Sequence, residues 1–309
     1  MKFGAQLWSQ RTTWPEWRDA AIAAEAAGWD SVWTWDHLLA IFGPWEQPIF
    51  EGWSLLVAAG ALTSRVRLGL MVGANTFRNP GLTAKLATTL DHVSGGRAVL
   101  GIGGAWFERE HEAFGIETWG SGFGERLDRL DEAVMLMRRL LDGERFSHEG
   151  RFYHFTDGLC EPRPIQQHLP ILIGGSGPKK TLRTTALRAD AWNTSGTVEE
   201  VRTKLDTLHQ RCAEVGRNPA EIELTISFPI IIRDDPREAG KVYAASLAAN
   251  NTTDMGSVPL ILGPPSLLAE TLRPYRDMGF STMIARLPWP YDRETIDRIE
   301  EVDDLLSDA

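Results

Sequence analysis

The sequence predicts an α/β fold, a (β/α)8 TIM barrel with insertions, built as a single domain over residues 1–309. Three observations lead to this prediction. Short apolar segments of strand length alternate along the whole chain with segments of helical periodicity. Eight strand segments belong to such units, and no linker-like stretch divides them into two groups. The length of 309 residues also suits a closed barrel of eight units.

The strand segments are short and mostly apolar without interruption, as expected for parallel strands that are covered on both faces. An open, doubly wound sheet is the alternative, and it is less favoured because the first strand-to-helix turn lacks the glycine pattern GxGxxG. In chain order the predicted strands are Phe3–Trp8, Ser31–Trp35, Arg67–Gly73, Ala98–Gly103, Ile171–Ile173, Ala191–Thr194, Glu223–Ile232 and Thr282–Leu287.

The helix segments between them carry recognisable end signals. The helix Trp14–Ala27 stops at Gly28, and Asn79-Pro80 opens a helix that runs to about Val93. Gly124–Leu141 is amphipathic, with an apolar face opposite its arginines and acids. The remaining predicted helices are Trp53–Thr63, Glu108–Phe114, Lys179–Arg188, Glu199–Val215, Pro236–Ala249, Ser266–Met278 and Arg293–Leu306.

Two segments interrupt the alternation of strands and helices. Residues near 146–156 alternate in polarity around Glu149-Gly150, which predicts an inserted β-hairpin. Residues near 250–262 are polar and rich in turn formers, which predicts a surface loop.

Composition excludes several classes of partner. A net charge of −10 argues against nucleic acid. Cys160 and Cys212 form no disulfide framework, and the histidines lack the spacing of metal ligands, so we expect no metal. No apolar run reaches the length of a membrane span, and the chain opens on a strand rather than a signal peptide, which favours the cytoplasm.

The segment from Leu172 to Thr181 is the most informative in the chain. A buried strand runs into a glycine turn and then into a helix start that carries two lysines. Free backbone N–H groups at such a turn, with cations beside them, are suited to a phosphate. The spacing matches neither the P-loop nor GxGxxG, and a plain turn that happens to contain glycines is the alternative. The candidate phosphate-binding residues are Gly174, Gly175, Ser176, Gly177, Lys179 and Lys180.

Function in a barrel lies at the carboxyl ends of its strands. Asp36-His37 is the carboxylate–imidazole pair at such an end, and histidine exchanges protons near neutral pH. A buried structural pair is the alternative. Glu110 and His111 belong to the short helix nearby, where they either close the site or cap a structure.

The chemistry is expected to come from an organic cofactor, because neither a nucleophile elbow nor a metal motif is present. Tryptophans cluster between Trp29 and Trp45, which predicts an aromatic cavity that suits a flat ring. Small residues at strand ends would let that ring approach closely: Gly73, Ala74, Gly103, Gly104 and Ala105.

The order of motifs resembles the bacterial luciferase-like superfamily, and within it the branch that uses the deazaflavin coenzyme F420. The resemblance runs nearly end to end, and its motifs are specific in combination rather than singly. The matching segments are Gly28–His37, Arg67–Pro80, Gly95–Trp106, Glu110–Gly115, Pro170–Thr181, Ala189–Thr194 and Gly263–Pro265.

The resemblance implies a TIM barrel, a homodimer, and F420 bound at the carboxyl face of the barrel. It implies that His37 and Asp36 lie against the deazaflavin ring as catalytic and cofactor-binding residues. It further implies a non-prolyl cis peptide at Met71-Val72, against the ring's other face. Gly73, Gly103, Gly104 and Ala105 would lie near the ring, and the loop Gly174–Lys180 would hold the phosphate.

The chain departs from the F420-dependent sugar-phosphate dehydrogenases at two positions. Trp106 stands where they have a glutamate, and Ile41 where they have a tryptophan. An apolar substrate pocket of Trp8, Ile41, Trp45 and Trp106 would suit an apolar or unsaturated substrate. We therefore expect hydride transfer between the deazaflavin C5 and a small organic molecule, with His37 as the proton donor. The alternatives are an FMN-dependent luciferase-like monooxygenase and a non-catalytic flavin-binding barrel.

Overall fold

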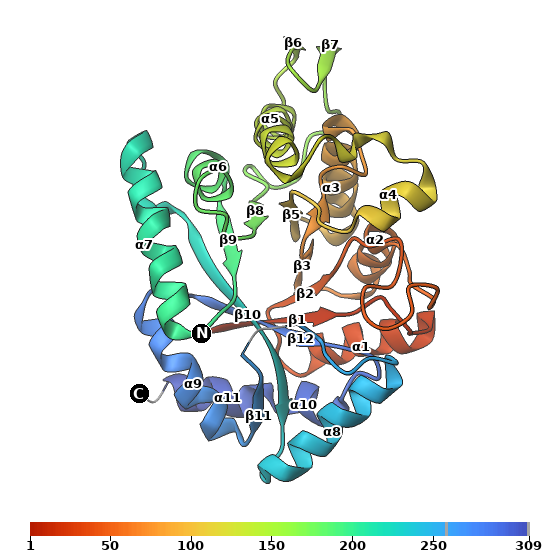
Figure 1. Cartoon of the computed structure of the whole chain (residues 1–309), viewed down its shortest axis with the longest axis vertical. Helices are drawn as coiled ribbons and strands as arrows, with labels where there is room; N and C mark the ends of the chain where they lie inside the picture. Colours follow the sequence, from red (N-terminus) through yellow and green to blue (C-terminus); the bar gives the residue numbers. More distant parts are fainter. Residues whose placement is uncertain (257–258, 308–309) are drawn as a thin grey trace.

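Eight parallel strands close into a barrel that is surrounded by helices (Figure 1). The structure is a computed structural model that describes residues 1–256 and 259–307. The strands pair in the order β1, β2, β3, β5, β8, β9, β10, β12, and β12 pairs again with β1. This closure confirms the predicted TIM barrel and excludes the open sheet. The barrel strands are β1 Lys2–Leu7, β2 Ser31–Thr34, β3 Arg67–Leu70, β5 Ala98–Gly103, β8 Ile171–Gly174, β9 Ala191–Thr194, β10 Glu223–Ile232 and β12 Thr282–Leu287.

Side-chain caps define where several helices begin. Thr13 and Thr197 each form a capping box, and Asn79 accepts a hydrogen bond from the backbone N–H of Gly81. The helices are α1 Trp14–Ala26, α2 Gly52–Leu62, α3 Pro80–Ser94, α4 Glu108–Phe114, α5 Phe123–Leu141, α6 Thr181–Arg188, α7 Val198–Val215, α8 Pro236–Ala249, α9 Pro265–Asp277, α10 Arg293–Asp297 and α11 Ile299–Ser307.

The barrel interior is filled at its amino-terminal end and open at the other. Trp33 belongs to an internal apolar cluster that also contains Val99, Leu172, Ala191 and Ile284. A Cβ on Gly4 or Gly69 would lie within 2.7 Å of the Trp33 indole, so these glycines make room for the ring. A larger apolar cluster packs the helices against the outside of the barrel.

The third strand is shorter than predicted. β3 ends at Leu70, a cis peptide joins Met71 to Val72, and the pairing resumes in β4, Gly73–Ala74, against β5. The Met71 carbonyl leaves the ladder and accepts a hydrogen bond from Gln6 Nε2 at 2.9 Å. The segment that was expected to be one strand is therefore two strands joined by a bulge, and the bulge faces the pocket.

Three further segments complete the chain. A two-stranded hairpin, β6 Phe146–Glu149 with β7 His154–Gly158, projects beyond α5 (Figure 1). The predicted loop near 250–262 ends earlier, because β11, Ile261–Gly263, pairs with β10. The predicted last helix is broken at Arg298 into α10 and α11. In the described part of the chain, no helix is long and apolar enough to cross a membrane.

Candidate functional site

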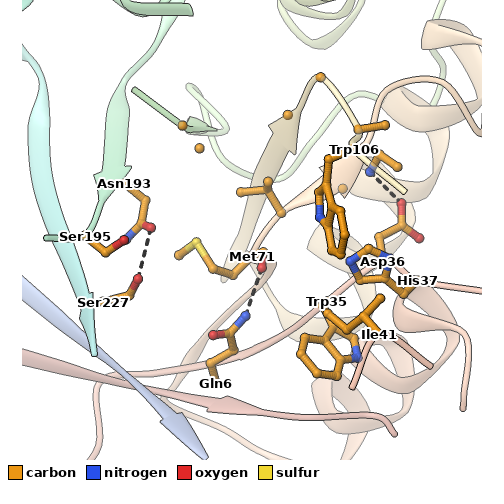
Figure 2. Close-up of a pocket in the computed structure, with 18 of the residues that line it drawn as sticks. Gln6, Trp35, Asp36, His37, Ile41, Met71, Trp106, Asn193, Ser195 and Ser227 are labelled. Atoms are coloured by element: carbon orange, nitrogen blue, oxygen red, sulfur yellow. Dashed lines mark hydrogen bonds between the residues drawn. The ribbon is translucent and has the colours of Figure 1, made fainter. Parts of the chain in front are cut away.

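A pocket of about 480 Å³ opens at the carboxyl ends of the barrel strands (Figure 2). Its volume lies in the range of small-molecule sites. Asn193, Ser195 and Ser227 form a polar side, and an aromatic side with Trp35 and Trp106 stands opposite (Figure 2). Every strand of the barrel contributes to the lining, either directly or through the loop that follows it. The strand ends thus meet around one cavity.

Most of the residues selected from the sequence line this pocket. The cavity brings together Trp8, Asp36, His37, Ile41, Met71, Val72, Gly73, Gly103, Gly104, Ala105, Trp106, Gly174, Gly175 and Ser176. It does not include Trp45, Gly177, Lys179 or Lys180. Trp45 instead stacks with the guanidinium of Arg109, 4.8 Å from the ring centroid, and is 40% exposed.

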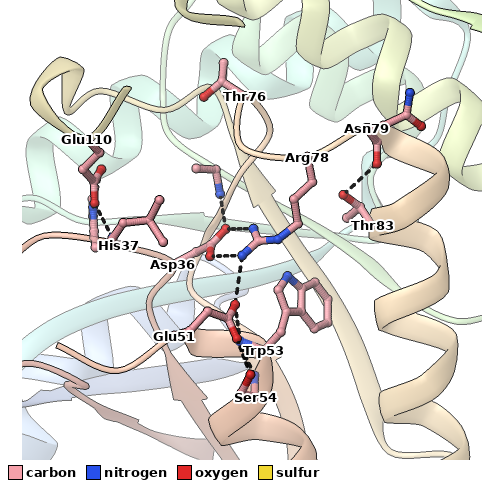
Figure 3. A network of polar contacts seen from close by, with 12 residues as sticks. Asp36, His37, Glu51, Trp53, Ser54, Thr76, Arg78, Asn79, Thr83 and Glu110 are labelled. Atoms are coloured by element: carbon pink, nitrogen blue, oxygen red, sulfur yellow. Dashed lines mark hydrogen bonds and ion pairs between the residues drawn. The ribbon is translucent and has the colours of Figure 1, made fainter. Parts of the chain in front are cut away.

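His37 is held by Glu110 (Figure 3). The sequence alone did not decide whether Glu110 closes the site or caps a structure. The Nδ1 atom of His37 lies 3.1 Å from both carboxylate oxygens of Glu110. The same carboxylate accepts hydrogen bonds from the backbone N–H groups of Leu38 and Leu39. Glu110 is only 1% exposed and is fixed by these contacts, and a carboxylate acceptor beside Nδ1 favours the tautomer with Nδ1–H. Nε2 is left without a partner among the described residues.

Asp36 does not pair with His37, contrary to the sequence hypothesis of a carboxylate–imidazole unit. Both its oxygens accept hydrogen bonds from Arg78, at 2.6 and 2.9 Å, and one also accepts from the backbone N–H of Ala74 (Figure 3). Burial lowers the pKa of Arg78, but the charges of Asp36 and Glu51 outweigh it and the net pKa is raised. Asp36 is therefore a structural anchor between the end of β2 and β4.

The glycine turn after β8 leaves backbone N–H groups without partners among the described residues, but its two lysines do not line the pocket. Gly175 has a φ of 113°, which a side chain would oppose. The backbone N–H groups of Ser176 and Gly177 have no acceptor among the described residues. Lys180, in contrast, turns toward α5, where Nζ lies 2.6 Å from an oxygen of Asp128.

Lys204 is a cation that lines the same pocket as this turn, and sequence reasoning missed it. It reaches from α7 into the lining of the pocket, where Nζ donates to the carbonyl of Ser195 at 2.7 Å. No motif marks it, because Lys204 lies within α7 rather than at the end of a strand, where the functional residues of a barrel are expected.

Two of the strand-end glycines accommodate Val72. A Cβ on Gly103 or Gly174 would lie 2.8 Å from a methyl of Val72. These glycines therefore set the position of the bulge at Met71-Val72, and through it the shape of the pocket wall.

The apolar wall is a stack of aromatic rings. Trp8 lies 4.7 Å from Phe42 with nearly parallel planes, and 4.5 Å from Trp35. Met255 and Ile41 pack against this stack. Trp106 is 61% exposed at the mouth of the pocket, 5.5 Å from the His37 ring.

Arg286, at the end of β12, also lines the pocket and was missed. Its place near the carboxyl end of the eighth barrel strand is the signal in the sequence that could have identified it. Among the described residues, no group of histidine, cysteine and carboxylate side chains is placed to hold a metal ion.

Comparison with known proteins adds to this geometry. The model of the family "Luciferase-like monooxygenase" matches residues 1–258. An "F420-dependent glucose-6-phosphate dehydrogenase" of Microbacterium testaceum is 33% identical over 243 residues, which are 76% of this chain and 69% of that protein. A protein of the same name from Nakamurella multipartita is 30% identical over 319 residues, covering 93% and 91%.

A solved structure shares the fold. An "F420-dependent secondary alcohol dehydrogenase in complex with an F420-acetone adduct" superposes with a TM-score of 0.82 at 19% identity, covering 99% of each chain. The barrel, the match to the family model and the identity to the curated relatives agree: the chain belongs to the luciferase-like monooxygenase family.

Proposed function

We propose that this protein is an F420-dependent oxidoreductase that transfers hydride between the deazaflavin C5 and a small apolar or unsaturated organic substrate. Relatives that are named F420-dependent dehydrogenases support the cofactor. The observation that carries the proposal is one pocket with a turn of free N–H groups on one side and a carboxylate-held histidine on the other.

The residues present fit a cofactor with a phosphorylated tail. The N–H groups of Ser176 and Gly177 and the ammonium of Lys204 would hold the phosphate. The wall at Met71-Val72 and the small residues Gly104 and Ala105 would receive the ring. When bound, F420 supplies the hydride chemistry at C5.

His37 would handle the proton that accompanies hydride transfer. Glu110 holds the ring through Nδ1–H, so a protonated His37 would present its Nε2–H to a substrate atom that gains negative charge. Asp36 would act through the backbone only, since Arg78 occupies its carboxylate.

The aromatic wall supports an apolar or unsaturated substrate. Trp8, Phe42 and Ile41 offer stacking and dispersion contacts rather than the hydrogen bonds a sugar requires. Hydride transfer to an activated C=C, C=N or C=O carbon fits a site that supplies one proton donor.

Turnover without oxygen tests the proposal. Reduced F420 is mixed anaerobically with activated alkenes, imines and carbonyl compounds, and its reoxidation is followed by absorbance. Substrate-dependent reoxidation supports hydride transfer. Turnover that requires reduced FMN and oxygen would favour the monooxygenase alternative. Ligand binding without turnover of either cofactor would favour a non-catalytic barrel.

We also propose a cytoplasmic homodimer. Both cysteines are free and buried, as in reducing compartments. Leu62 of α2 and Leu82 of α3 are about half exposed, at 49% and 52%, on neighbouring helices that a second copy could cover. Light scattering at several concentrations measures the oligomeric state.

A further inference from the structure

Arg286 brings a guanidinium into the pocket without an acidic partner. Its Nη2 donates to Ser227 Oγ at 3.0 Å, and that hydroxyl lies 3.4 Å from Asn193 Oδ1. Across residues 1–256 and 259–307 no carboxylate forms an ion pair with it. Burial lowers its pKa to about 10, with no charge to offset the loss of water, yet the side chain remains a cation at neutral pH.

Arg233, near the end of the neighbouring strand β10, shows how this barrel otherwise treats such a cation. It contacts Asp292 at 2.6 Å and Glu294 at 3.1 Å. A charge removed from water without a partner is unfavourable, and its unmatched donors add to the cost. Stability alone therefore does not explain Arg286, whereas a ligand that brings the missing negative charge does.

The pocket holds an excess of unpaired positive charge. Its two acids are both engaged, Asp36 by Arg78 and Glu110 by His37 with two backbone N–H groups. The cations Arg286 and Lys204 contact only neutral oxygens in the residues described. In a chain of net charge −10, this local reversal of sign marks a site for an anion.

We propose that Arg286, oriented by Ser227, binds an oxyanion inside the pocket, either a carboxylate of the substrate or the ionised phenolic oxygen of the deazaflavin. This inference rests on the proposed function, whose pocket it shares. A guanidinium offers paired N–H donors that match a carboxylate. Ser227 accepts from Arg286 Nη2 and donates to Asn193 Oδ1, so it orients the guanidinium. Arg286 pairs in register with Gln6, which holds the Met71 carbonyl, so the oxyanion would lie next to the bulge.

Replacement of Arg286 by methionine tests the inference first in the protein without ligand. Removing an unpaired, partly buried cation should raise the thermal midpoint of Arg286→Met by about 2 °C. The matched control is Arg233→Met, which removes the ion pair of Asp292 and should lower the midpoint while leaving ligand binding unchanged. Arg286→Lys keeps the charge without the planar fork and serves as a second variant if the methionine protein does not fold.

Ligand binding then distinguishes the two sources of the oxyanion. If the source is the substrate, cinnamate should bind the F420-loaded protein at least about tenfold more tightly than cinnamamide, and Arg286→Met should remove that preference. If the source is the deazaflavin, Arg286→Met should weaken F420 binding about tenfold. It should also raise the pKa of the bound phenol, followed by absorbance.

Two results would contradict the inference. In the first, Arg286→Met keeps both the cinnamate preference and the F420 affinity of the wild type. In the second, the wild type shows no preference for cinnamate, and Arg286→Met binds F420 as tightly as the wild type does. Failure of the wild type to bind F420 contradicts the proposed function instead, and the cinnamate comparison on the protein without cofactor then still decides the role of Arg286.

Discussion

At the scale of single residues, the contact between His37 and Glu110 distinguishes this site from a plain apolar pocket. The histidine ring is held through Nδ1, and the carboxylate that holds it is buried and fixed by backbone N–H groups. The Nε2 atom is therefore held in a fixed orientation, which is what general acid catalysis requires of a proton donor.

Removal of the imidazole should separate catalysis from binding. His37→Ala is expected to lower kcat by about 100- to 10,000-fold, the usual contribution of a positioned acid, with F420 affinity retained. Steady-state kinetics and a binding titration measure the two quantities. Full turnover in this variant would remove the proposed role of His37.

The two lysines near the phosphate turn should behave differently. Lys204→Ala should weaken F420 binding about tenfold, because its ammonium lines the pocket. Lys180→Ala should leave the affinity unchanged, because that side chain is paired with Asp128. Equal effects of the two substitutions on F420 affinity would contradict the proposal that Lys204, and not Lys180, holds the phosphate.

At the scale of elements, the bulge between β3 and β4 depends on glycines in two neighbouring strands. Gly174→Ala places a methyl against Val72 and should weaken F420 binding by about tenfold or more, through displacement of the wall. The double variant with Val72→Ala should recover affinity. Gly240→Ala, in α8 with nothing within 4 Å, is the matched control and should bind F420 as the wild type does. Failure of the double variant to recover would rule out this steric account.

The start of α10 is expected to make stability depend on pH. Burial raises the pKa of Asp292, but hydrogen bonds from Arg233 and Thr295 outweigh it and the net pKa lies below the ordinary 3.8. Because the folded pKa is lowered, the stabilisation is complete above that ordinary value and is lost as pH falls through the folded pKa.

Asp292→Asn should therefore lower the free energy of unfolding by about 2 kcal/mol at pH 7. The difference from wild type should shrink below about pH 4. Urea denaturation at the two pH values measures it. A difference that is the same at both would mean that the ionised form is not the stabilising one.

At the scale of the whole molecule, the fold was predictable because each β/α unit carries its own local signal. Apolar strands, a glycine after α1 and Asn79 before α3 can all be recognised in the sequence without tertiary contacts.

The site was only partly predictable. Nothing in the sequence pairs His37 with Glu110, which lies 73 residues away. Lys180 appeared suited to an anion until the packing of α5 brought Asp128 to it. Position in the barrel, not motif, brings Arg286 into the pocket.

Parallel titration of the protein without cofactor with oxidised F420 and with FMN tests the central claim most directly. Several tryptophans line or adjoin the pocket, so quenching of their fluorescence reports binding. We predict tight binding of F420 and weak binding of FMN. Tight FMN binding with weak F420 binding would contradict the proposal and indicate a flavin enzyme that uses oxygen. Binding of neither cofactor would contradict the assignment of the turn after β8 as a phosphate site.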